Sequence, residues 1–77
     1  MESFVVMLIE FNSDTDYVEF LEFLEDGDTT CTGNRDELQV TVGKEDLLGA
    51  MEMDSEIGLE GELTMLYGGK IEDWHED

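Results

Sequence analysis

Positive charge is what this sequence has least of. Three Lys and Arg residues stand against 22 Asp and Glu, so the formal net charge is −19 over 77 residues. Small domains usually carry a net charge of about 2–8 in magnitude, and repulsion at this density destabilises the compact state. Because phosphate contacts require clustered Lys and Arg, direct binding to nucleic acid or to anionic membranes is disfavoured.

Cysteine, proline and long apolar stretches are also scarce. The single cysteine, Cys31, excludes an internal disulfide and suits a reducing cytoplasm. The longest apolar run, residues 4–9, is far shorter than the ~20 residues of a membrane-spanning helix. The start, Met1-Glu2, lacks the positive charge with which secretory signals begin. We therefore expect a cytoplasmic protein, in the host cell if it is encoded by a phage.

What the sequence does contain is enough hydrophobic residues for a core. They make up 40% of the chain, and the acidic residues are spread from Glu2 to Asp77 instead of forming one block. A diffuse charge of this kind covers a folded surface. We expect one marginally stable domain over residues 1–77, with Met7, Met51, Met53 and Met65 filling gaps in its core.

Residues 14–26 give the clearest helical signal. Ser13 is placed as the N-cap, in a variant capping box, and Gly27 is placed to end the helix. Four apolar residues follow the i, i+3, i+4, i+7 spacing of one buried face: Tyr17, Phe20, Leu21 and Leu24.

The remaining elements are predicted from apolar runs, alternation and glycine breaks. Residues 3–10 are typical of a central strand. Further strands are expected at 29–32, 37–42 and 62–67, and a weaker helix at 44–53. Residues 70–77 are expected to form an acidic tail, either flexible or with one helical turn.

This order predicts a small α+β domain with an antiparallel sheet. The arrangement β-α-β-β-α-β is the split β-α-β topology called ferredoxin-like. Its first and third strands are central, and in this chain they are the most apolar. Since the second half is weakly patterned, β-α-β-β-β is the alternative.

Residues that could support catalysis are few. His75 lies among acidic residues that favour its charged form, and Cys31 lacks the positive surroundings that lower a thiol pKa. The acidic pairs do not match the calcium-loop pattern, and no phosphate-binding glycine loop is present. We expect no enzyme, no catalytic residue, no cofactor and no metal site.

The outer face of the predicted first helix is the most informative feature. Glu19, Glu22 and Asp26 lie opposite the apolar face and step about 4.5 and 6 Å along the helix axis. No Lys or Arg interrupts them, so the helix lacks the i, i+4 ion pairs that usually stabilise surface helices. Either this is an ordinary solvated face or its carboxylates take the place of backbone phosphates.

Two further acidic clusters follow, at 52–62 and 72–77, and the second contains Trp74. Trp74 is either a hydrophobic anchor in an interface or a cover over the core. The predicted partner-binding residues are Asp14, Asp16, Glu19, Glu22, Glu25, Asp26, Asp28, Glu52, Asp54, Glu56, Glu60, Glu62, Glu72, Asp73 and Trp74.

In charge density, size and mixed α/β pattern, the chain resembles the phage-encoded DNA-mimic inhibitors. This class includes uracil-DNA glycosylase inhibitor, anti-restriction proteins and acidic anti-CRISPR proteins. The resemblance implies an inhibitor that occupies the basic nucleic-acid groove of a host defence complex or nuclease, and the anti-CRISPR type is the leading form. The alternatives are a halophile-adapted acidic domain and a small acidic adaptor that docks on a basic protein.

Overall fold

The computed structural model describes residues 5–76, with side chains described as far as residue 73. Ser3 and Phe4, the start of the first predicted strand, lie outside the described residues. Within them the elements, in chain order, are β1 Val5–Phe11, α1 Asp14–Asp26, β2 Cys31–Asn34, β3 Gln39–Gly43, α2 Lys44–Ala50, α3 Leu59–Tyr67 and β4 Gly69–Glu76.

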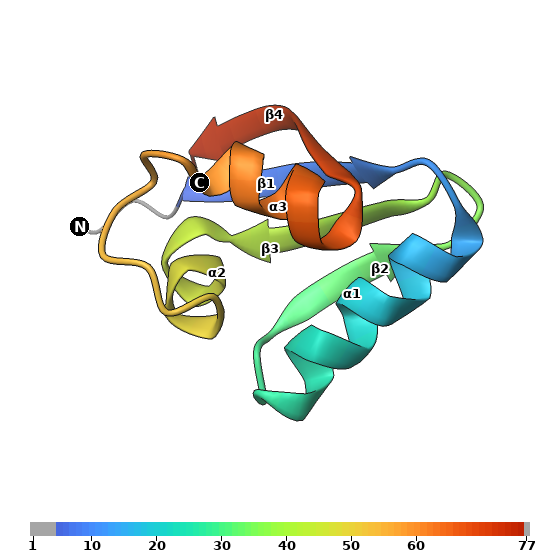
Figure 1. Ribbon diagram of the computed structural model, residues 1–77, viewed down its shortest axis with the longest axis horizontal. Coiled ribbons are helices and arrows are strands. Elements are labelled where there is room, and N and C mark those ends of the chain that lie inside the picture. Colours follow the sequence, from blue (N-terminus) through green and yellow to red (C-terminus); the bar gives the residue numbers. More distant parts are fainter. Residues whose placement is uncertain (1–4, 77) are drawn as a thin grey trace.

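The strands form one antiparallel sheet in the order β2-β3-β1-β4. This is the ferredoxin-like order, with two short helices, α2 and α3, in place of the usual second helix. The prediction that the first and third strands are central is confirmed, and the β-α-β-β-β alternative is wrong. Figure 1 shows α1 and α3 crossing the sheet, with β4 along one edge of it.

The core lies between the helices and one face of the sheet. Met7, Ile9 and Phe11 alternate along β1 and are fully or almost fully buried, whereas Glu10 between them is exposed. Because successive strand residues point to opposite faces, the helices cover one face only. Further core residues come from the neighbouring strand and the three helices: Tyr17, Phe20, Leu24, Val40, Val42, Leu47, Leu59 and Leu63.

Helix α1 has the predicted bounds, because its signals are local. The Ser13 hydroxyl accepts a hydrogen bond from the Asp16 backbone N–H at 3.2 Å, which satisfies one of the free donors at the helix start. Gly27 follows the last turn. Leu21, predicted with the buried face, is half-buried.

The last two predicted elements are wrong. Residues predicted as a strand at 62–67 belong to helix α3, and the predicted helical turn in the tail is strand β4. Gly68, at φ 68°, ends α3 in the left-handed conformation that favours glycine. Met65 lies on the outer side of α3 with a relative exposure of 71%, so its predicted core role is wrong as well.

A β-bulge explains why Ile71 and Trp74, which lie three residues apart, both belong to strand β4. The register pairs Ile71 with Ile9 and Trp74 with Met7, but no β1 residue is paired with Glu72. An inserted residue of this kind turns a strand spacing of two into three, which imitates one helical turn. The Glu60 carboxylate accepts a hydrogen bond from the Ile71 backbone N–H at 3.3 Å. This bond joins α3 to β4 next to the bulge.

The other boundaries shift by small amounts. Strand β3 begins at Gln39, later than predicted, because Leu38 lies in the preceding turn with a positive φ of 54°. Strand β2 occupies residues 31–34 and α2 ends at Ala50. In the part of the chain described, no helix is long and apolar enough to cross a membrane.

Candidate functional site

The outer face of α1 is a continuous acidic surface. Glu19, Glu22 and Asp26 are exposed, on the side of the helix away from buried Tyr17 and Phe20. Among the described residues, none of the three carboxylates has a hydrogen bond or ion pair within the molecule. Their negative charge is therefore available to a partner.

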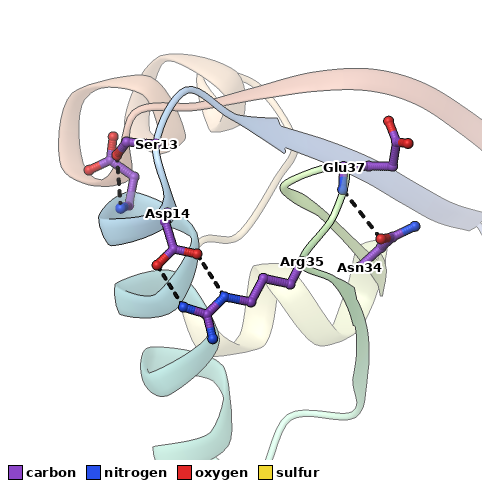
Figure 2. Close-up of polar contacts among 6 residues, drawn as sticks. Ser13, Asp14, Asn34, Arg35 and Glu37 are labelled. Carbon is purple, nitrogen blue, oxygen red and sulfur yellow. Dashed lines mark hydrogen bonds and ion pairs between the residues drawn. The ribbon is translucent and has the colours of Figure 1, made fainter.

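The first turn of α1 is different, because Asp14, one of its two acidic residues, is already engaged. Arg35 reaches back from the β2–β3 turn and donates two hydrogen bonds to the Asp14 carboxylate, both at 2.8 Å (Figure 2). These bonds hold the pKa of Asp14 below its ordinary value and raise the pKa of Arg35. A two-pronged pair of this kind fixes geometry as well as charge. Asp14 thus has an intramolecular role beside its predicted one.

Two members of the second cluster are also engaged. Glu56 lies 3.6 Å from the Lys44 ammonium, and Glu60 holds the β4 bulge. Glu52 and Asp54 are exposed in the segment between α2 and α3, and Glu62 is half-buried on α3. The cluster therefore combines carboxylates that stabilise the fold with carboxylates that face solvent.

An acidic hollow joins the first and second clusters. It lies between the end of α1 and helix α2, and four carboxylates line it: Asp28, Glu45, Asp46 and Glu52. The sequence analysis did not include Glu45 and Asp46 among the partner-binding residues. Both lie in the first turn of α2, where acidic residues are common because they interact favourably with the helix dipole. The negative end of the α1 dipole, near Asp28, adds to the same negative potential.

Two of these acidic residues adopt a backbone conformation that normally favours glycine. Asp28 has a φ of 55° and Glu52 a φ of 57°. The left-handed region costs an L-residue roughly 1–2 kcal/mol. Both positions therefore carry negative charge at a cost in stability.

The third cluster lies away from the first, next to Glu60 of the second. Glu72 and Asp73 are exposed on β4, at the sheet edge opposite β2, and Figure 1 shows β4 and α1 on opposite sides of the molecule. Asp16, by contrast, is half-buried and lies near Gly68 at the end of α3. The side chains of Trp74 and His75 lie outside the described residues, so the two roles considered for Trp74 stay predictions.

The remaining polar groups add little chemistry. Cys31 is a half-buried free thiol, and both its burial and the negative charge of Glu25 raise its pKa. A raised pKa disfavours the reactive thiolate. Among the described side chains, no group of three or more His, Cys, Asp or Glu could hold a metal ion.

No family model, curated protein or solved structure matches this chain. The arrangement of charge is thus the basis for considering its function.

Charge per unit length is the quantity that sets the molecule apart. The domain measures 37 × 23 × 23 Å. A DNA duplex as long as its 37 Å axis carries about 22 phosphate charges, at one per ~1.7 Å. The chain carries 22 acidic residues and a net charge of −19. Along its long axis the domain therefore has nearly the charge of duplex DNA.

Proposed function

We propose that this protein is an acidic DNA mimic that occupies the basic nucleic-acid groove of a host defence complex or nuclease. The inhibitor blocks that groove by binding in place of nucleic acid, and the anti-CRISPR type is the leading form. The observation that carries the proposal is the match in charge between 37 Å of duplex DNA and this domain. The site of action is the cytoplasm of the host cell.

The unpaired carboxylates of α1 support this function physically. Glu19, Glu22 and Asp26 are fixed on a capped helix, and within the described part of the chain none of them pairs with a cation. In a groove lined by Lys and Arg, they meet the charges that otherwise contact phosphate. Complementary potentials of this kind accelerate association and select the partner.

The test begins with capture of partners on three immobilised proteins. The first is the native chain, and the second carries Glu19→Lys, Glu22→Lys and Asp26→Lys. The third, a matched control, carries Glu10→Lys, Asp36→Lys and Glu37→Lys, which changes the net charge equally at exposed positions outside the proposed site. Each captured protein is then purified, and its binding to a labelled DNA duplex is measured while each variant is added.

We expect the native chain and the control to retain a basic nucleic-acid-binding protein and to displace DNA from it competitively. The α1 variant should bind at least about 100-fold more weakly, because reversed charges repel the groove. Binding by the α1 variant at native strength would remove α1 from the interface. Undisturbed DNA binding with the chain bound would contradict the proposal and favour an adaptor role. Retention of no protein, with folding only at high salt, would favour halophilic adaptation.

A further inference from the structure

An apolar groove lies beside the acidic face of α1. Phe23 of α1, Met51 at the end of α2, and Leu66 and Tyr67 of α3 line it, and its volume is about 350 Å³. Its aromatic residues are firmly supported. The Phe23 and Tyr67 rings stack with their centroids 5.2 Å apart, and the Tyr67 ring also packs edge-on against buried Phe20 at 5.3 Å.

Part of this apolar surface is open to solvent. Leu66 has a relative exposure of 56%, although it lines the groove. Exposed apolar surface next to a groove is typical of a binding site. Ile57 and Met65 are more exposed still, but only Leu66 among these three lines the groove, so its side chain is available to a ligand there.

The surroundings of the groove identify the chemistry of that partner. Glu52 and Glu62 line the groove together with the apolar side chains, and no Lys or Arg does. On α1, Glu19 and Asp26 are four residues before and three residues after Phe23, so they lie within about 60° of it around the helix. A groove lined by both apolar side chains and carboxylates is complementary to an apolar side chain flanked by Lys or Arg. A second copy of this chain is a poor occupant, because it brings another net charge of −19.

We infer that the groove binds a large apolar side chain presented by a basic surface segment of the partner protein. This inference deepens the proposed function and rests on it for the identity of the partner. The carboxylates of α1 then accelerate encounter, and the groove slows dissociation, since charge acts mainly on the association rate and buried apolar anchors supply binding energy.

Two synthetic helical peptides of equal length and equal lysine content test the inference without a natural partner. One carries Leu at helical spacing along one face, and the other carries Ala at the same positions. Dissociation constants are measured by calorimetry at 0.15 M salt for the native chain, for Leu66→Gln and for Met65→Gln. Met65 is the matched control, because it is more exposed than Leu66, lies on the same helix and does not line the groove.

The native chain should bind the Leu peptide at least about tenfold more tightly than the Ala peptide, since burial of one Leu side chain favours binding by more than this factor. Leu66→Gln should remove most of this preference, and Met65→Gln should keep it. In the native chain, the Leu peptide should also shift the ring resonances of Phe23 and Tyr67 in nuclear magnetic resonance spectra. Equal binding of the two peptides, or an unchanged preference in Leu66→Gln together with unshifted rings, would overturn the inference.

Failure of the groove and failure of the proposed function can be told apart. Competition with DNA that survives Leu66→Gln, with equal binding of both peptides, leaves DNA mimicry intact and removes the groove. A clear preference for the Leu peptide, with no DNA competition on any captured protein, supports the groove and contradicts DNA mimicry.

Discussion

The first turn and the outer face of α1 carry the same kind of side chain and use it differently. In the first turn, Asp14 holds the only Arg of the chain and joins the helix to the β2–β3 turn. On the outer face, Glu19, Glu22 and Asp26 have no cation within reach among the described residues. The comparison teaches that a carboxylate in this chain is structural where a cation or a backbone N–H reaches it, as Arg35 reaches Asp14 and the Ile71 N–H reaches Glu60. Most of the 22 acidic residues are left for solvent or a partner.

Of the changes considered, a rise in salt concentration should have the largest effect on the stability of the fold. Between 0.05 and 0.5 M NaCl the screening length falls from about 14 to about 4 Å, so repulsion among unpaired carboxylates weakens. We expect the Tm of the native chain to rise by at least about 4 °C, or about 1 kcal/mol for a domain of this size. The Glu19→Lys, Glu22→Lys, Asp26→Lys variant should show a smaller rise. Equal Tm values at both salt concentrations would show that the unpaired carboxylates do not destabilise the fold.

Glu52 separates the effect of charge from that of the backbone. Because its φ is 57°, Glu52→Gly should raise the free energy of unfolding by about 1 kcal/mol. Glu22→Gly removes the same charge but lies within α1, where glycine costs about 1 kcal/mol, so its stability should fall. Urea unfolding of both variants measures the difference. A loss of stability in both would mean that the backbone at Glu52 stores no strain.

The contrast within the first helix can be tested by two substitutions of equal charge. Asp14→Asn breaks the pair with Arg35, whereas Asp26→Asn removes an unpaired carboxylate. At pH 7 the Tm of Asp14→Asn should lie below that of Asp26→Asn by a few degrees at most, because exposed pairs contribute little.

The pH dependence of that contrast follows from the lowered pKa of Asp14. A carboxyl whose pKa is lowered by folding contributes stability above its unfolded pKa, about 3.9, and loses it as the pH falls through the folded value. The Tm gap between the two variants should therefore close below about pH 3.9. A gap that persists in strong acid would show that charge pairing is not its cause.

The outer face of α1 could be predicted from the sequence because helix periodicity alone determines it. Ser13, Gly27 and the apolar spacing all act within a few residues of one another. The partner of Asp14 could not be predicted, since Arg35 is 21 residues away and their contact depends on how β2 and β3 fold back. The acidic face can therefore be predicted from the sequence, whereas the structural role of Asp14 cannot.

The prediction of a strand at 62–67 is wrong because the apolar residues there fit both the two-residue period of a strand and the 3.6-residue period of a helix. Leu63, Met65 and Tyr67 alternate like a strand, yet Leu59, Leu63 and Leu66 also recur like a helix. The tertiary structure selects the helix. Strand β4 pairs with the edge of β1 that residues 62–67 would otherwise occupy as a strand, and α3 packs beside β4. The exposure of Leu66, and with it the groove, follows only from this tertiary arrangement.

The smallest expected effect concerns Glu25, a carboxylate of α1 that acts on the nearby thiol of Cys31. Glu25 raises the pKa of the Cys31 thiol, in addition to the larger effect of burial. Glu25→Gln should lower that pKa, increase the thiolate fraction and accelerate alkylation by iodoacetamide at pH 7.5. Charge interactions at exposed sites are worth about 0.2–1 kcal/mol, which corresponds to about a 1.4- to 5-fold change in rate. Glu22→Gln, the matched control on the same helix, should leave the rate unchanged. Equal acceleration in both variants would mean that Cys31 responds to the overall negative potential of the domain and not to Glu25 in particular.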